Sequence, residues 1–214
     1  MSGRQPARQR TSFATLRQFT RERVVEERCE LCGAVVSPDH QHMSLVESQR
    51  LLCCCDACAI LLSNQGGTKY HRVPRRVQFL PDFRMTDIQW DSLLIPIAIA
   101  FFFQSTPANR VVALYPSPAG ATESLLSLEA WSELVQDNPV LQELEPDVEA
   151  LLVNRLNSSR EYFRVPIDEC YKLVGLIRIN WRGFSGGSET WAAIDQFLAA
   201  LKERSLAQGS ASRA

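Results

Sequence analysis

Apolar residues from position 97 onwards predict a short antiparallel sheet. Residues 97–104 are almost all apolar and rich in isoleucine and phenylalanine, which is typical of a buried strand. The chain is expected to turn at 106–109, and residues 110–115 are predicted to return as the antiparallel partner of that strand. Residues 161–165 are predicted to form an edge strand.

Apolar residues spaced three or four apart predict helices around this sheet. Thr86 is the expected N-cap of a short helix, and Pro146 is a position where a new helix can start. Pro166, followed by two acidic residues, predicts a helix that ends near residue 181, and Ser188 is expected to cap the last helix. The predicted buried positions are Leu125, Leu128, Trp131, Leu134 and Val135; Val148, Leu151, Leu152 and Leu156; Cys170, Leu173, Val174 and Ile177; and Trp191, Ile194, Phe197, Leu198 and Leu201.

The first half of the chain contains a cysteine cluster, in which six of the seven cysteines fall within residues 29–58. Two C-x-x-C pairs separated by a hairpin-length gap are the usual spacing of a tetrahedral four-thiolate site. Gly33 follows the first pair and permits a tight turn, whereas an apolar run at 59–62 follows the second pair and predicts a helix. Strands at 42–47 and 50–54, around a turn at 48–49, would supply the hairpin of a treble-clef finger.

The ligands are chosen by strand geometry, because neighbouring residues on a strand point to opposite faces. Residues 53–55 are three consecutive cysteines and cannot all bind one ion easily. The two histidines of the 38–42 turn are candidate ligands, hydrogen-bond partners of the ligands or plain surface residues. The predicted metal ligands are Cys29, Cys32, Cys55 and Cys58, with Cys53, His40 and His42 in reserve.

Composition and charge exclude several classes of protein. The chain has 214 residues with 45% hydrophobic content, enough for one packed domain and a small appendage. A net charge of -1 gives no global attraction to nucleic acid. The longest apolar run, 93–103, contains a proline and is too short for a membrane span, which needs roughly 20 residues. We therefore predict a cytoplasmic protein, in which clustered thiols favour a metal over disulfides.

These signals divide the chain into segments. We predict an α+β fold, with a small treble-clef-like four-cysteine metal finger followed by a helix-rich α+β domain that has a short antiparallel sheet. The basic strip at 69–76 is expected to be an extended linker lying on the larger domain. The predicted segments are a disordered tail at 1–11, a helix at 12–28, the metal-binding finger at 29–66, the α+β domain at 69–204 and a disordered tail at 205–214.

Two glycine-containing loops are weighed as anion or partner sites. The Pro/Gly loop at 115–122 precedes a predicted helix, where free N–H groups could bind an anion, but a plain structural loop is preferred. Side chains and N–H groups of the loop at 181–189 could converge on a carboxylate or phosphate, but a helix–helix turn is again preferred. Its candidate contacts are Arg182, Ser185, Gly186, Gly187 and Ser188.

Several motifs spread along the chain point to one family. They are Cys29–Gly33, Leu51–Cys53 with Cys55–Cys58, Val73–Arg76, Tyr115–Ser124, Asp147–Arg155, Pro166–Tyr171 and Trp181–Gly187. Together they resemble a family of uncharacterised proteins encoded beside actinobacterial-type NiFe uptake hydrogenases. The resemblance implies an accessory role in hydrogenase maturation, assembly or electron supply, and no defined activity. Cys54 departs from the pattern of that family and is left out of the ligand set.

Three functions follow, and none of them is assigned a catalytic residue. The preferred hypothesis is a non-catalytic zinc-binding accessory protein that contacts a protein partner, such as hydrogenase subunits or maturation factors. The alternative is a redox protein that holds iron or an iron–sulfur cluster in the same thiolates. The third is a treble-clef nucleic-acid-binding protein, which the uneven charge supports only at two basic segments. The chain has three histidines and no recognisable catalytic motif, so an enzyme is the minority interpretation.

Overall fold

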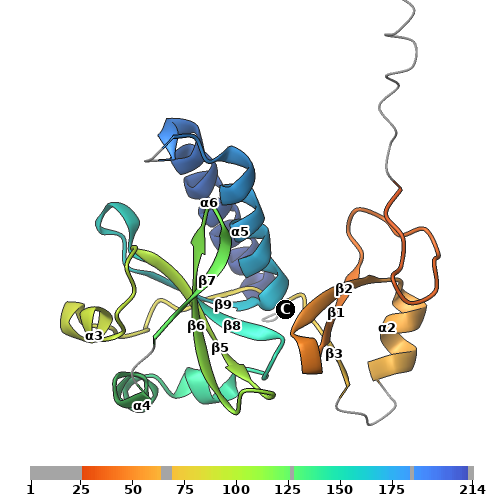
Figure 1. Ribbon diagram of the computed structural model, residues 1–214. Helices are drawn as coiled ribbons and strands as arrows, with labels where there is room; N and C mark the ends of the chain where they lie inside the picture. Colours follow the sequence, from red (N-terminus) through yellow and green to blue (C-terminus); the bar gives the residue numbers. More distant parts are fainter. Residues whose placement is uncertain (1–25, 64–68, 126–127, 184–185, 212–214) are drawn as a thin grey trace, which may run out of the picture.

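A computed structural model describes residues 26–63, 69–125, 128–183 and 186–211. A small three-stranded sheet lies beside a larger six-stranded sheet with helices on both faces (Figure 1). The predicted α+β class is confirmed. No helix among the described residues combines the length and apolarity needed to cross a bilayer.

The small sheet belongs to the finger and has the strand order β2-β1-β3. Strands β1 (Gln41–Leu45) and β2 (Arg50–Cys54) form the predicted hairpin, and α2 (Asp56–Ser63) is the predicted helix after it. A 3-10 turn, η1 (Val46–Ser48), joins the two strands. Strand β3 (Tyr70–Arg72) pairs with β1, so the start of the basic strip is part of the finger sheet. The expectation that this strip is a linker on the larger domain is therefore wrong at β3.

The large sheet has the order β4-β9-β8-β5-β6-β7, and all its neighbouring strands are antiparallel. It has more strands than the short sheet that the sequence predicts. Strand β9 lies inside the sheet, between β4 and β8, and not at its edge. The strands are β4 (Gln78–Phe79), β5 (Ile99–Ser105), β6 (Arg110–Ser117), β7 (Gly120–Ser124), β8 (Glu149–Asn154) and β9 (Glu161–Pro166).

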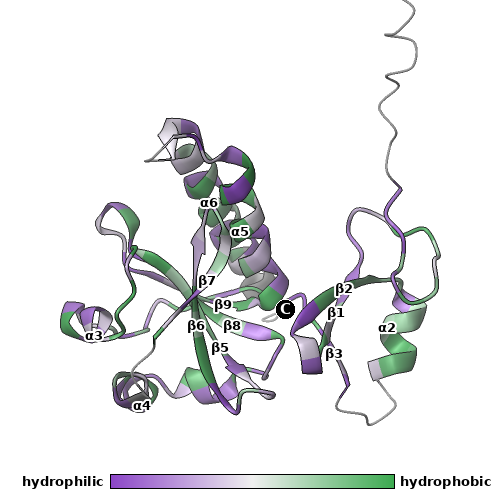
Figure 2. Cartoon of the chain, viewed as in Figure 1, coloured by the Kyte–Doolittle hydropathy of each residue, from purple (hydrophilic) through white to green (hydrophobic). Residues whose placement is uncertain are grey.

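Helices cover both faces of this sheet, which explains the unbroken apolar run on β5. Phe101 and Phe103 pack in the core beneath α5 (Ile167–Asn180) and α6 (Gly187–Ala211). Phe102 points to the opposite face and stacks on Trp131 of α4 (Leu128–Asp137), with ring centroids 5.3 Å apart. The remaining short elements are α3 (Asp87–Ser92), η2 (Pro139–Glu143) and η3 (Leu156–Ser158). Figure 2 shows hydrophobic residues along the sheet strands.

Strand β8 corrects the helix predicted from Val148, Leu151 and Leu152. All six of its residues are buried, and successive side chains alternate between the two core layers. A short apolar run covered on both faces lacks the period that distinguishes a strand from a buried helix. The neighbouring strand supplied that distinction, because Leu152 pairs with Phe101 of β5.

The Pro/Gly loop at 115–122 is a β-hairpin and does not open a helix. Strand β6 continues to Ser117, which pairs with Gly120 at the start of β7. The Ser117 hydroxyl donates to the Gly120 carbonyl at 2.9 Å, and Gly120 has a φ of 128° that favours glycine. Helix α4 begins only at Leu128, and Leu125 is 89% exposed. The helix N-terminus required for the suggested anion site is therefore not part of this loop.

The chain ends differ from the expected segments. The helix predicted for 12–28 lies mostly outside the described residues, and Arg28 forms an isolated bridge with Val35. Helix α6 continues to Ala211, so residues 205–211 are helical and not a disordered tail. Ser205 is buried, and its hydroxyl accepts a hydrogen bond from the Phe79 amide at 2.5 Å. This bond ties α6 to the edge strand β4.

Candidate metal centre

The four predicted cysteine ligands lie together at one end of the finger. The sulfur atoms of Cys29, Cys32, Cys55 and Cys58 all lie within 4.8 Å of one another. The Cys32 and Cys55 sulfurs are 3.7 Å apart. A tetrahedral zinc ion with Zn–S bonds of about 2.3 Å places its sulfur ligands about 3.8 Å apart. The spacing therefore fits a four-thiolate metal site.

A tight turn places the first pair of cysteines. The Gly33 amide donates to the Cys29 carbonyl, and the Cys29 amide donates to the Ala34 carbonyl, both at 2.8 Å. Gly33 has a φ of 77°, which is the conformation that glycine adopts at least cost. The turn folds the backbone beneath the two sulfurs, as the glycine after the pair predicts.

The first turn of α2 places the second pair. Cys55 precedes the helix, and its carbonyl accepts a hydrogen bond from the Ala59 amide at 3.0 Å. The Cys58 amide donates to the Cys55 sulfur at 3.5 Å. N–H groups and the helix dipole at a helix N-terminus favour the thiolate form of cysteine. The helix that sequence predicts after this pair therefore also contributes to its chemistry.

Electrostatics in the cluster favour a bound cation. Burial raises the pKa of Cys29, but hydrogen bonds from backbone amides, that of Cys55 first, outweigh burial and lower it to about 6. Contacts with the sulfurs of Cys32 and Cys55 raise the pKa of the Cys58 thiol. Four thiolates this close repel one another unless a positive charge lies between them. A divalent metal ion would supply that charge.

Cys54 does not belong to the four-sulfur cluster. It is fully buried in the small core of the finger, where its sulfur donates to the Gln41 carbonyl at 3.4 Å. Burial raises its pKa to about 11. Alternation along β2 accounts for this position, because Cys53 and Cys54 must face opposite sides of the hairpin.

The three reserve ligands form a group of their own. His40, His42 and Cys53 offer ligand atoms that lie within 4.8 Å of one another, and none of these residues belongs to the four-cysteine group. His42 lies opposite Cys53 across the hairpin, and this strand pairing distinguishes the reserve ligands from the four-cysteine group. Sequence could have found the second group only by predicting the correct pairing. Pairing that follows a predicted two-residue turn at 48–49 would instead have placed His42 opposite Cys55.

The other predicted site, the loop between α5 and α6, is a compact turn in its described residues. The Arg182 guanidinium donates to the carbonyls of Ile179 and Trp181, at 3.1 and 3.2 Å, and so satisfies the C-terminal end of α5. Gly186 has a φ of 85°, and a Cβ atom there would lie 3.0 Å from the Trp181 ring. Ser185 lies outside the described residues, while Gly187 and Ser188 begin α6.

The cysteine of the larger domain, Cys170, is expected to be unreactive. Cys170 is completely buried on α5, and burial raises its pKa well above the ordinary value for a thiol. A neutral buried thiol behaves as a small hydrophobic residue.

Comparison with protein families identifies the chain by one match. A model for a family of unknown function, DUF5947, matches residues 28–205, which include both groups of candidate ligands and both sheets. The chain belongs to DUF5947. No curated protein and no solved structure matches it. The description of DUF5947 names no activity, metal or partner, so function is argued from the site.

Proposed function

We propose that this DUF5947 protein is a non-catalytic metal-binding accessory protein whose four-cysteine site holds a structural zinc ion. The observation that carries the proposal is the convergence of four cysteine sulfurs within 4.8 Å of one another. A site with four protein thiolates is closed, because no coordination position remains for a substrate. Such a site stabilises a fold and does not perform chemistry on a bound molecule.

The small core of the finger supports a structural role for the ion. Its fully buried residues are Cys29, Met43, Cys54 and Ala59, and two of these are themselves cysteines. So little apolar surface cannot offset the entropy of ordering the turn, hairpin and helix. Binding of a structural zinc ion contributes about 10 kcal/mol or more to folding. The sequence of turn, hairpin and helix-borne pair supports the treble-clef interpretation of this finger.

Elemental analysis and a visible spectrum of protein purified without oxygen test the choice of metal. Tightly held zinc without visible colour is the expected result. Stoichiometric iron with charge-transfer bands would replace this proposal by the redox alternative. Loss of the tightly held ion in Cys58→Ser, with retention in Cys54→Ser, would assign it to the four-cysteine site.

The accessory role requires a partner, and the resemblance to proteins encoded beside NiFe hydrogenases supports a hydrogenase subunit or maturation factor. A contact surface is available on α2, where Ile60 and Leu61 are 54% and 63% exposed. Figure 2 shows this helix as mostly hydrophobic. Apolar residues grouped on a surface are typical of protein contact sites.

Affinity purification from cells that produce the hydrogenase tests this role. The wild-type chain should enrich hydrogenase subunits or maturation factors, and an Ile60→Glu/Leu61→Glu variant should not. The variant must keep its metal, which shows that the finger is folded. Equal recovery of these proteins with both chains, or with neither, would contradict the assigned surface.

A further inference from the structure

The group of His40, His42 and Cys53 lies on the face of the hairpin opposite the buried Cys54. His42 on β1 pairs with Cys53 on β2, and residues paired across antiparallel strands share a face. His40 precedes β1, and its ring lies 4.7 Å from the ring of His42, measured between centroids. Three side chains of the two ligand types that transition metals prefer, imidazole and thiolate, therefore meet at one place.

His40 has a ring nitrogen that lacks a partner. Its Nδ1 lies 2.8 Å from the Ser37 carbonyl oxygen, which can only accept, so Nδ1 carries the proton and Nε2 keeps its lone pair. This Nε2 atom is buried and has no hydrogen-bond partner among the described residues. The His40 side chain is only 7% exposed. Buried polar atoms nearly always have a partner, and a metal ion would be one here.

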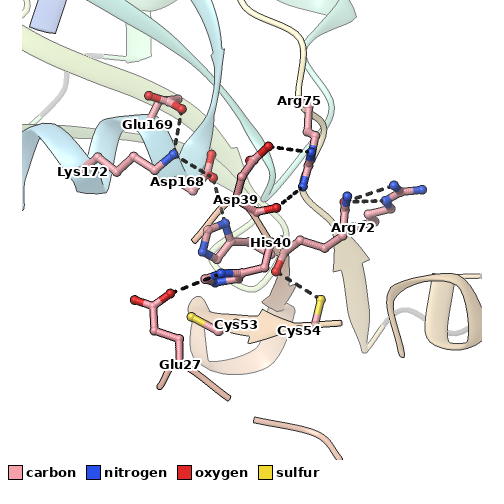
Figure 3. A network of polar contacts seen from close by, with 12 residues as sticks. Glu27, Asp39, His40, Cys53, Cys54, Arg72, Arg75, Asp168, Glu169 and Lys172 are labelled. Carbon is pink, nitrogen blue, oxygen red and sulfur yellow. Dashed lines mark hydrogen bonds and ion pairs between the residues drawn. The ribbon is translucent and has the colours of Figure 1, made fainter. Parts of the chain in front are cut away.

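His42 is oriented by the larger domain. Its Nδ1 lies 2.9 Å from the Asp168 carboxylate, which belongs to the first turn of α5. The ionised carboxylate accepts the Nδ1 proton and leaves Nε2 of His42 as the metal-binding nitrogen. Histidine ligands of metals usually donate their other ring N–H to a carboxylate in this way. Figure 3 shows Asp168 above His40 and Cys53 below it.

Both histidines line a cavity of about 260 Å³ between the finger and α5. Lys172 and Arg204 also line it, and each forms an ion pair with Glu169, at 2.9 and 3.1 Å. We propose that His40, His42 and Cys53 bind a divalent transition-metal ion whose fourth coordination position opens into this cavity. The site differs from the closed four-cysteine site because it can take an exchangeable ligand.

The donor set selects the class of metal. Two imidazoles and one thiolate suit Zn²⁺, Co²⁺ or Ni²⁺ and do not suit Mg²⁺ or Ca²⁺, which prefer oxygen ligands. Three protein ligands with one open position is the pattern of zinc sites that exchange water or substrate. Two neutral imidazoles and one thiolate leave a net charge of +1 on the bound ion. The open position therefore favours water, hydroxide or a small carboxylate.

Cobalt titration of the full-length chain under reducing conditions tests the proposal. The protein is first dialysed against a weak chelator, which leaves only tightly held metal, and Co²⁺ is then added while visible absorption is followed. The wild-type chain should bind one further equivalent of Co²⁺. Its thiolate-to-cobalt band should be weaker than that of cobalt at a four-cysteine site, because one thiolate binds instead of four.

Variants assign the second equivalent and separate it from the structural metal. His40→Ala, His42→Ala and Cys53→Ser should lose the second equivalent and keep the tightly held ion. Cys54→Ser is the matched control, since its sulfur lies on the other face of β2, and it should keep both. Wild-type protein that binds no further Co²⁺, or histidine variants that bind it as the wild type does, would overturn the second site. Absence of a tightly held ion would instead contradict the structural-zinc proposal alone.

Asp168 and the open position give two sharper tests. Asp168→Asn should weaken Co²⁺ binding by about 10–100-fold without changing the visible band, because the ligands are unchanged. Asp168→Glu, which keeps a carboxylate, should restore part of the affinity. Sodium acetate should shift the cobalt band by filling the fourth position. Equal affinities of wild type and Asp168→Asn would exclude the positioning role, and a band unaffected by acetate would exclude the open position.

Discussion

The finger and the six-stranded domain differ in what holds them together. The larger domain has two apolar layers, one on each face of its sheet, with phenylalanines 101, 102 and 163 completely buried. The apolar cluster of the finger has only four buried members among the described residues, and a group of thiols lies beside it. Apolar burial therefore stabilises the larger domain, whereas the finger, on the function proposed above, depends on a metal ion. The difference teaches that a segment with a small apolar core needs another source of stability, which four clustered thiols can supply by binding a metal.

Loss of the structural metal should have the largest effect. In Cys29→Ser, amides of β1 and β2 should lose their protection from hydrogen exchange, because about 10 kcal/mol of metal-binding free energy is withdrawn from the finger. Amides of β5 and β8 should stay protected, since their core contains no metal ligand. Hydrogen exchange measured by mass spectrometry checks both regions. Protection that survives in the finger, or is lost equally in both regions, would contradict the comparison.

Loss of a buried ion pair should destabilise the larger domain without removing the metal. Arg164 on β9 donates through Nε to both carboxylate oxygens of Glu149 on β8, at 2.9 Å, and both side chains are almost fully buried. Glu149→Gln should lower the free energy of unfolding by about 3–5 kcal/mol, because it removes the buried carboxylate and leaves Arg164 only the exposed Glu143 carboxylate, 3.4 Å from its Nη1, as a charged partner. Urea denaturation checks the loss, and the metal content should be unchanged.

The matched control for that experiment replaces both partners. Glu149→Leu/Arg164→Met removes both charges together, so it should be much less destabilising than Glu149→Gln. If Glu149→Gln unfolds at the same urea concentration as the wild type, the pair does not stabilise the larger domain.

The turn between α5 and α6 should respond to a single methyl group. Gly186→Ala should cost about 1–3 kcal/mol, since the positive φ disfavours alanine and the added Cβ would meet the Trp181 ring. Gly175 on α5 is a suitable control, because nothing lies within 4 Å of a Cβ there and its φ is ordinary for a helix. Gly175→Ala should be neutral or stabilising by up to about 1 kcal/mol. Thermal unfolding distinguishes the two variants.

The smallest effect is expected at the N-cap of α3. The Thr86 hydroxyl accepts from the Gln89 amide at 3.1 Å, and the Gln89 side chain accepts from the Thr86 amide at 2.9 Å. Thr86→Ala should lower the free energy of unfolding by about 1 kcal/mol. Thr86→Ser keeps the hydroxyl and should stay close to the wild type in the same denaturation experiment. Equal losses in both variants would show that the cap is not the source of the effect.

The sequence by itself determined the elements whose signals are local. The N-cap at Thr86, the proline that precedes α5 and the spacing of the two C-x-x-C pairs all act within a few residues, so they could be interpreted without a fold. The convergence of the four cysteine sulfurs was predicted for the same reason. The glycine turn and the helix start each impose their own geometry on a pair.

Only the tertiary structure decided the features that depend on distant neighbours. Strand β8 is a strand because it pairs with β5 and β9, and its continuous burial hides the alternation that would identify it. The second ligand group depends on the register of the β1–β2 hairpin, which the 3-10 turn η1 sets. Asp168 reaches His42 only because the finger packs against α5. Such contacts join residues far apart in the chain, and no local pattern of residue types specifies them.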